Sequence, residues 1–336
     1  MATRSLIFNA CKLLFLLVWI SFIFSGCGGK RDGDTQTALI ITIEDPRLDA
    51  EIRKALRLDD TEAITIEKAL DLVTLNAHNR EIENLDGINY FTNLESLNLR
   101  ANNINNISPL AELTNLKELD LSENNIEEIS SLESLRDLRQ LDLGANQISE
   151  LPSFEDSNLE SLFLQNNKIS NLNNLRDLEN LIMLDLSQNK IIECISTLGS
   201  LKKLKWLDLE NTGISEIPSF DYSYSLESLF LGGNTITDIA PLRDLENLIE
   251  LDLSQNNLAD VTALESLNSL RWLDLENTGI SEIPAFEDPN LESLFLRGNG
   301  LSDLSRLGNL TKLRLLDLKD NKDIVDISPI SSLREL

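Results

Sequence analysis

One spacing of leucines runs through most of this 336-residue sequence and restricts the folds open to it. The pattern L-x-x-L-x-L-x-x-N-x-I/L recurs in steps of 21 to 23 residues, mostly 22. Its copies begin at Leu94, Leu116, Leu138, Leu159, Leu181, Leu204, Leu226, Leu248, Leu270, Leu291 and Leu313. A degenerate copy precedes them, starting at Leu72. A fixed period of this length is the signature of stacked repeats, so we expect residues 72–336 to form a solenoid of about 12 copies.

The residues of one copy predict the structure of a repeat. In Leu116–Leu121 the leucines alternate with polar residues, which is typical of a short strand with the leucines inward. Asn124 follows at the turn, where its short amide is expected to bond backbone groups left free at the strand end. Thr212 and Thr278 replace this asparagine in two copies and are expected to bond in a milder way. Prolines recur between the strands and disfavour long helices there, so we expect short turns or 3₁₀ segments on the convex side.

A longer period lies above the first. Leu138, Leu204 and Leu270 are each 66 residues apart and open similar blocks. Each block continues with I-S-E-L/I-P-S/A-F and then L-E-S-L-F-L. The sequence is therefore interpreted as a block of three repeats that was triplicated.

A different pattern precedes the repeats and predicts a cap over the exposed end of the solenoid, residues 38–71. Asp45 and Pro46 are typical of a helix start, as an N-cap acceptor followed by a proline in the first turn. The expected apolar face of this helix consists of Leu48, Ile52 and Leu56. A second short helix is expected over Ile66 to Leu72.

The first 26 residues are typical of an export signal. Arg4 and Lys12 are followed by about twelve mostly apolar residues, fewer than the roughly 20 that a bilayer-spanning helix needs. Residues 24–27, F-S-G-C, resemble the signal box of bacterial lipoproteins, which implies a lipid on Cys27. An ordinary signal peptide and an uncleaved anchor are the alternatives. Residues 27–37 begin small and polar and are expected to form a flexible tether.

The resemblance to lipoproteins also implies a location. The protein is expected outside the cytoplasm, anchored by lipid to a bacterial membrane. Gly28 after the cysteine resembles the outer-membrane class if the cell has two membranes. Surface and periplasmic orientations both stay open.

The cap and first repeats resemble those of bacterial internalin-type proteins. The matching segments are Asp45–Leu48 with Ile52 and Leu56, then Leu85–Leu94, then Asn106–Leu116. The resemblance covers residues 45–336 and implies an α/β solenoid, a right-handed leucine-rich-repeat horseshoe with parallel strands on its concave face. It also implies an extracytoplasmic binding role. The immunoglobulin-like segment and the wall-sorting signal of that family are missing from the sequence.

Composition excludes several classes of function. The formal net charge is −27, so phosphates of nucleic acid and anionic lipid surfaces would be repelled. Cys194 is the one cysteine in the repeats, and we expect it to be half-buried packing rather than a reactive thiol. His78 is the only histidine, which excludes a multi-histidine metal site. We expect no cofactor and no metal.

Aromatic residues mark the expected working surface. Residues between the inward leucines should project from the concave face. One column of them carries Phe163, Phe230 and Phe295, and a neighbouring column carries Trp206 and Trp272. We expect Trp206 near Phe230 and Trp272 near Phe295. Exposed aromatics are favoured anchors of protein interfaces, so these five residues are candidate ligand-binding residues.

Carboxylates stand beside the aromatic residues. Asp208, Glu210, Asp274 and Glu276 complete the candidate surface and favour a partner with basic and apolar groups. The alternative is that these positions were copied with their block and bind nothing, the aspartates being solvated residues of an acidic spacer in the cell envelope.

Paired aspartates raise a remote third hypothesis, a hydrolase. Neighbouring carboxylates about 5 Å apart can shift a pKa or hold a calcium ion. The expected pairs are Asp120 with Asp142, Asp185 with Asp208, and Asp252 with Asp274. A shallow open surface offers no catalytic pocket, so we expect a binding protein and not an enzyme.

Overall fold

The computed structural model describes residues 39–336 except residue 192 and segments 221–224 and 287–288. The chain divides into two units, Met1–Thr37 and Ala38–Leu336. The expected signal peptide (1–26), the expected lipid site at Cys27 and the expected tether (27–37) lie outside the described residues. Within the described part, no helix has the length and apolar character needed to cross a bilayer.

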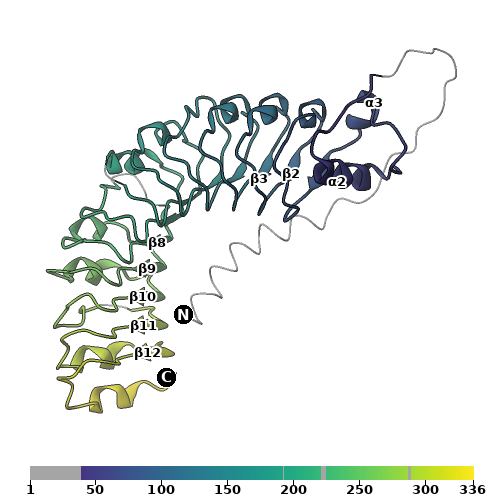
Figure 1. Ribbon diagram of the computed structural model, residues 1–336. Coiled ribbons are helices and arrows are strands. Elements are labelled where there is room, and N and C mark those ends of the chain that lie inside the picture. The colour runs from purple at the N-terminus through teal and green to yellow at the C-terminus, as the bar shows by residue number, and fades with distance from the viewer. Residues whose placement is uncertain (1–38, 192, 221–224, 287–288) are drawn as a thin grey trace. The chain divides into compact units, whose positions relative to one another are not determined.

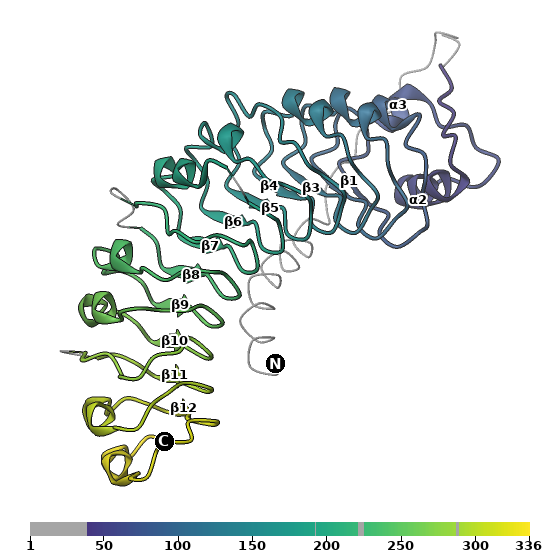
Figure 2. The ribbon, with the colours of Figure 1, turned by 60° about the vertical axis from the view of Figure 1, so that its left-hand side comes forward.

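The described part of the second unit contains one sheet of twelve short parallel strands, stacked in sequence order (Figures 1 and 2). The strands are β1 Thr74–Asn76, β2 Ser96–Asn98, β3 Glu118–Asp120, β4 Gln140–Asp142, β5 Ser161–Phe163, β6 Met183–Asp185, β7 Trp206–Asp208, β8 Ser228–Phe230, β9 Glu250–Asp252, β10 Trp272–Asp274, β11 Ser293–Phe295 and β12 Leu315–Asp317. Each inner strand pairs with the strand before and the strand after it, and β1 and β12 do not pair with each other, so the sheet is open. This confirms the predicted leucine-rich-repeat horseshoe with strands on the concave side.

Short 3₁₀ helices lie on the convex side, as the prolines predicted (Figure 2). They span Ile88–Tyr90, Ser108–Glu112, Ser130–Ser134, Asn173–Leu175, Ile195–Ser200, Ala240–Leu242, Thr262–Ser266, Ser305–Asn309 and Ser328–Ser332. The I-S-E-L/I-P-S/A-F segments have no helix. Their Phe154, Phe220 and Phe286 side chains are buried instead.

The core is a continuous column of leucine and isoleucine between the two sides. The central leucine of every strand from Leu97 to Leu294 is fully buried, and it pairs in register with the central leucine of the next strand. The two residues that flank it in the strand point to the concave surface, as the period of two requires. One repeat cannot bury its own leucines, so the fold is stable only as a stack.

An asparagine at the exit of the strand joins consecutive repeats. Asn146 donates from Nδ2 to the carbonyls of Leu121, Leu143 and Gly144 at 3.0, 3.0 and 3.4 Å. Its Oδ1 accepts from the backbone N–H of Ile126 at 3.0 Å. Leu121 and Ile126 belong to the preceding repeat. The asparagine ladder has further members with equivalent bonds: Asn102, Asn124, Asn167, Asn189, Asn234, Asn256, Asn299 and Asn321.

Threonine interrupts the ladder twice and shows what the amide does. Thr212 donates from Oγ1 to the carbonyl of Leu209 at 2.8 Å, but it cannot reach back to the preceding repeat. Its own backbone carbonyl accepts the N–H of Ile191 there, at 3.1 Å. Thr278 repeats this arrangement, with its carbonyl accepting from Leu258. The backbone thus shifts to satisfy the donor that an asparagine would have bonded.

Two helices cover the β1 end of the sheet, α2 Pro46–Leu56 and α3 Ile66–Ala69. Leu48 and Ile52 of α2 are fully buried. The second helix is shorter than the expected Ile66 to Leu72. Helix α2 packs against β1, where a further repeat would otherwise be needed to cover the core.

The N-cap of α2 also binds the cap to the first repeat. Asp45 accepts from the backbone N–H groups of Arg47 and Leu48 with Oδ1 and from those of Glu83 and Asn84 with Oδ2. Burial raises the pKa of Asp45, but these four N–H donors outweigh it and hold that pKa below its ordinary value.

Replacing one member of the asparagine ladder should weaken the whole stack. Asn146→Ala leaves a buried backbone N–H and buried carbonyls without their partner, and we expect it to lower the free energy of unfolding by about 3 kcal/mol. Urea unfolding monitored by circular dichroism measures this. Gln147→Ala, at the exposed next position, is the matched control and should change stability by less than about 0.5 kcal/mol. Equal effects of the two variants would show that the ladder is not a main source of stability.

Candidate functional site

Four aromatic rings form a continuous row on the concave face, which we name the aromatic ladder. It consists of Trp206, Phe230, Trp272 and Phe295 on β7, β8, β10 and β11. The ring centroids are 5.6 Å apart for Trp206 and Phe230 and 5.6 Å apart for Trp272 and Phe295, with interplanar angles of 49° and 53°. Both expected pairs are therefore confirmed. Tilted contacts at this distance are favourable for aromatic rings.

A third contact joins the two pairs and was not expected from the sequence. Phe230 and Trp272 have centroids 6.3 Å apart although β9 lies between their strands. In the register, Phe230 lies opposite Asp252 and Trp272 lies opposite Glu250. The two rings therefore meet across β9. Sequence reasoning compared only adjacent strands, and the large size of both side chains was the signal that it overlooked.

Phe163, the remaining aromatic candidate, lies on β5 and is not part of the aromatic ladder. Phe163 is half-buried at the end of β5, the position that Phe230 occupies three strands later. Its block has Gln140 at the place of the tryptophans. The triplicated blocks thus present two tryptophan–phenylalanine pairs and one phenylalanine without the matching tryptophan.

Most of the strands that do not end in phenylalanine end in aspartate, and its side chain accepts a hydrogen bond from the turn that follows. In each, Oδ1 accepts from the backbone N–H two residues later, at 2.8 to 3.0 Å. The pairs are Asp120 with Ser122, Asp142 with Gly144, Asp185 with Ser187, Asp208 with Glu210, Asp252 with Ser254, Asp274 with Glu276 and Asp317 with Lys319. Asn98 does the same for Arg100. The column is therefore a structural feature of the turn.

These aspartates are not solvated, in contrast to what the alternative of an acidic spacer assumed. From Asp120 to Asp274 their side chains are at most 8% exposed. In the register, Asp208 lies between Asp185 and Phe230, and Asp274 lies between Asp252 and Phe295. Asp208 and Asp274 are thus beneath the candidate surface, whereas the half-buried Glu210 and Glu276 remain at it.

Burial has an electrostatic consequence at Asp208. Burial raises the pKa of Asp208 well above its ordinary value, and the negative charges of Asp185, Glu210 and Asp252 raise it further. The backbone N–H of Glu210 acts in the opposite direction but does not offset them.

The three expected aspartate pairs are confirmed as neighbours in the register. Each carboxylate is bonded to its own turn, and water has little access to it. In the described ranges, no group of three or more His, Cys, Asp or Glu side chains is placed to hold a metal ion. The pairs therefore resemble parts of the framework more than a reaction site.

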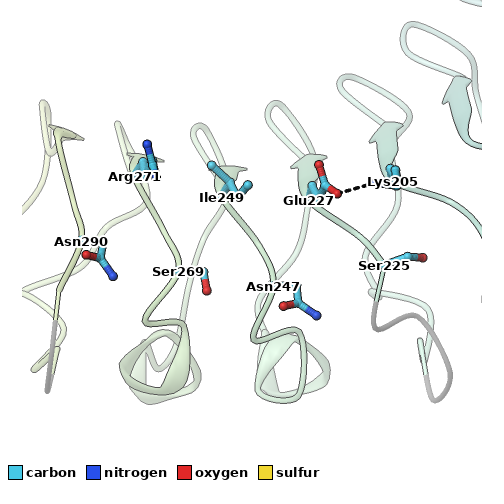
Figure 3. Close-up of a pocket in the computed structure, with 8 residues that line it drawn as sticks. All are labelled: Lys205, Ser225, Glu227, Asn247, Ile249, Ser269, Arg271 and Asn290. Carbon is cyan, nitrogen blue, oxygen red and sulfur yellow. Dashed lines mark hydrogen bonds and ion pairs between the residues drawn. The ribbon is translucent and has the colours of Figure 1, made fainter.

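A polar depression of about 610 Å³ lies on the flank where the chain enters strands β7 to β11 (Figure 3). It is lined by Lys205, Ser225, Glu227, Asn247, Ile249, Ser269, Arg271 and Asn290. Lys205 and Glu227 form an ion pair with Nζ and Oε1 2.7 Å apart. Lys205 and Arg271 directly precede the two tryptophans of the aromatic ladder. Because each of them pairs with a glutamate, Glu227 and Glu292, positive and negative charges are balanced on this flank.

Two residues noted in the sequence have local roles. Cys194 is half-buried with a φ of 63° and begins the 3₁₀ helix Ile195–Ser200 in the longest repeat. His78 is exposed and hydrogen-bonded to the side chain of Asn76 at 2.7 Å.

Comparison with known proteins agrees with this architecture. A family model described as leucine-rich repeats (2 copies) matches residues 114–156, 224–268 and 289–332. An internalin of Listeria monocytogenes is similar over 90% of this chain and 97% of its own, with 29% identity and a TM-score of 0.73. A search of curated proteins found no match.

Two further solved structures are similar. A leucine-rich-repeat protein of Leptospira interrogans shares 25% identity over 81% of this chain and 84% of its own, with a TM-score of 0.62. A plant peptide hormone receptor in complex with RGF2 shares 26% identity over 81% of this chain and 47% of its own, with a TM-score of 0.65. The chain thus contains leucine-rich repeats and resembles an internalin in structure, and these likenesses favour a role in protein interaction.

The buried carboxylate of Asp208 should make stability depend on pH. Because its pKa is higher in the folded than in the unfolded protein, its contribution to stability is present at low pH and is lost as pH rises through the folded-state pKa. Asp208→Asn keeps an Oδ1 acceptor for Glu210, as Asn98 does for Arg100, and removes the charge. We expect this variant to be more stable than the wild type at pH 8, with the difference shrinking towards pH 5.

Urea unfolding at pH 8, 6.5 and 5 measures the difference. Asp317→Asn is the matched control, because Asp317 has the same turn bond but is only half-buried. A gain for Asp208→Asn that is equal at all three pH values would contradict the electrostatic explanation.

Proposed function

We propose that this leucine-rich-repeat protein binds another protein on its concave face, at the aromatic ladder with Glu210 and Glu276. We further propose that a lipid on Cys27 holds it at a bacterial membrane, outside the cytoplasm. The observation that carries the binding role is the aromatic ladder. Four large rings in mutual contact stay half-buried on an open face, where polar side chains would serve solubility better.

The composition of this surface suits a protein interface. Tryptophan dominates the binding energy of many interfaces because it contributes a large rigid area at low conformational cost. The ladder offers such a centre, and Glu210 and Glu276 offer a polar rim. A partner with basic and apolar groups fits both features. The similar plant receptor was solved in complex with RGF2, and this supports ligand binding as a use of the fold.

Two alternatives differ in what they predict. An acidic spacer without a ligand accounts for the net charge of −27 but gives no reason for the half-buried tryptophans. A hydrolase would need accessible carboxylates, whereas the aspartate pairs are at most 8% exposed and bonded to their turns. Protein binding accounts for the rings and needs no accessible aspartate.

Removing both tryptophans of the ladder should abolish capture of the partner. With the protein as bait in an envelope extract, mass spectrometry identifies what is retained, and the purified partner then gives a Kd. We expect Trp206→Ala with Trp272→Ala to weaken binding at least about 100-fold, from roughly 1.5 kcal/mol or more lost at each anchor.

Gln140→Ala is the matched control, since Gln140 occupies the same place in the first block and carries no ring. It should bind as the wild type does. Wild-type affinity in the double tryptophan variant, with its circular dichroism spectrum preserved, would reject the concave site. Failure to retain any protein reproducibly would favour the spacer.

Lipidation makes a separate prediction. When the whole sequence is expressed in a bacterium, the mature chain should begin at Cys27 and carry the mass of a diacylglycerol and a further acyl chain. Cys27→Ser should lose this mass and leave the membrane fraction, because acyl chains provide the anchoring energy. Intact-mass spectrometry and fractionation measure both. Retention of residues 1–26, or an unmodified Cys27, would refute the proposal.

A further inference from the structure

We infer that the concave surface from β7 to β11 binds one extended polypeptide segment through two arginine or lysine side chains four residues apart. Each basic side chain occupies one of two equivalent sites. This inference rests on the proposed protein-binding function and adds to it the conformation and the anchoring residues of the partner.

The two sites are copies of each other in structure as well as in sequence. Site one consists of Trp206, Asp208, Glu210 and Phe230. Site two consists of Trp272, Asp274, Glu276 and Phe295. The ring centroids are 5.6 Å apart in both, and the interplanar angles differ by only 4°.

The acidic parts of the two sites also match. The buried Asp208 and Asp274 each accept from the backbone N–H of the following glutamate at 2.8 Å, and both glutamates are half-buried. The sites differ at one neighbouring position: Arg297 lies near Glu276 and pairs with Asp320, whereas Gly232 occupies the equivalent place near Glu210. The rings and carboxylates that the two sites share should bind the same chemical group.

The chemistry of each site selects a basic group with an apolar stem. Asp208 lies near the carboxyl groups of Asp185, Glu210 and Asp252, so site one is surrounded by acidic side chains. Aromatic faces attract cations, most strongly when the cation is partly desolvated. The methylene stem of arginine or lysine can lie on a ring while its charged end reaches the glutamate. Arginine fits best, because its planar guanidinium both stacks on rings and pairs with carboxylates.

The orientation of this basic group follows from the flank. On the side where the chain enters β7 and β10, Lys205 pairs with Glu227 and Arg271 lies 3.7 Å from Glu292. Charge is balanced there. On the opposite side, where the strands end, Glu210 and Glu276 lie at the surface. The cationic ends should therefore point to the ends of the strands.

The distance between the sites selects the conformation of the segment. Sites one and two begin on β7 and β10, three strand steps apart, and steps of about 4.8 Å give a separation of about 14 Å along the stack. An extended chain advances about 3.4 Å per residue, so four residues cover about 14 Å. Four is an even number, so both side chains face the same side of the segment.

Other regular conformations do not match this distance. An α-helix returns a side chain to the same side after seven or eleven residues, at about 10.5 or 16.5 Å. A polyproline II helix does so at about 9 and 19 Å. The contact of Phe230 with Trp272 fills the space between the sites, so the residues between the anchors should be small or apolar.

A panel of synthetic peptides tests the inference. Each peptide has eleven residues, two arginines and otherwise alanine and serine, so that net charge is constant while the arginines are two, three, four, five or seven residues apart. Tryptophan fluorescence reports binding directly, because two of the three tryptophans in the sequence belong to the ladder. The purified full-length protein is titrated in detergent at low salt.

We expect the peptide with a spacing of four to bind at least tenfold more tightly than those with spacings of three or five, since only there do both anchors engage at once. Trp206→Ala and Trp272→Ala, tested singly, should each reduce the affinity of this peptide to the level of a peptide with one arginine. Gln140→Ala should leave it unchanged.

Two outcomes would overturn the inference. Equal affinity at every spacing would mean that binding reflects charge alone, and tightest binding at a spacing of seven would indicate a helical partner. Either result can occur while the captured envelope protein still depends on Trp206 and Trp272. In that case the proposed function stands and the extended segment is wrong. Loss of both dependences would reject the two proposals together.

A gain-of-function variant examines the same idea from the other direction. The double variant Gln140→Trp with Gly144→Glu supplies the first block with the tryptophan and the glutamate that it lacks, beside Phe163, three strand steps before site one. The Cβ added at position 144 meets only the end of the Gln165 side chain, which can move. A longer peptide with arginines at positions i, i+4 and i+8 should then bind this variant at least about threefold more tightly than the wild type. The peptide with two arginines should show no difference. No gain for the longer peptide would contradict a ligand that runs along the stack.

Discussion

Hydrogen bonds from one asparagine in each repeat, except the two repeats with Thr212 and Thr278, fix the distance and the register between neighbouring coils. Asn146 ties the carbonyl of Leu121 and the N–H of Ile126 in the preceding repeat to its own turn, and the same bonds recur along the stack. Leucine packing alone tolerates sliding, because one leucine resembles the next. The asparagine bonds do not, because a buried donor or acceptor out of place loses its partner. The concave surface inherits its regular spacing from this inner ladder, and the equivalence of the two aromatic–acidic sites follows.

The aspartates at the strand ends combine a structural benefit with an electrostatic cost. Each satisfies the first N–H of its turn, as Asn98 does without a charge. Under the aromatic ladder this arrangement places like charges near one another beneath large rings, and the raised pKa of Asp208 is the result. A chain selected only for stability would favour asparagine at this position. The half-buried Glu210 and Glu276, rather than the buried aspartates, supply the surface charge that a cation would meet.

Much of the fold follows from the sequence, because a period of 22 and an alternation of two are geometric statements. They determine that Leu207 points inward and that Trp206 and Asp208 point to the concave face, and the paired rings of adjacent strands follow from the register. The sequence pattern does not predict how deeply a side chain is buried. Alternation indicates the side to which Asp208 points but not that its neighbours cover it. The contact of Phe230 with Trp272 depends likewise on the size of two side chains that reach over β9, which no pairwise comparison of adjacent strands contains.

Because the repeats come in blocks of three, the number of binding sites on this surface can change with the number of blocks. Because Leu138, Leu204 and Leu270 open equivalent blocks, a recombination event that inserts or deletes 66 residues joins coils that already fit each other. The asparagine bonds, the leucine core and the convex turns are regenerated at the junction. What changes is the number of aromatic–acidic sites, one for each block that carries the tryptophan. Insertion or deletion of a block can therefore change the number of binding sites for a ligand by one at a time, without any point mutation in the core.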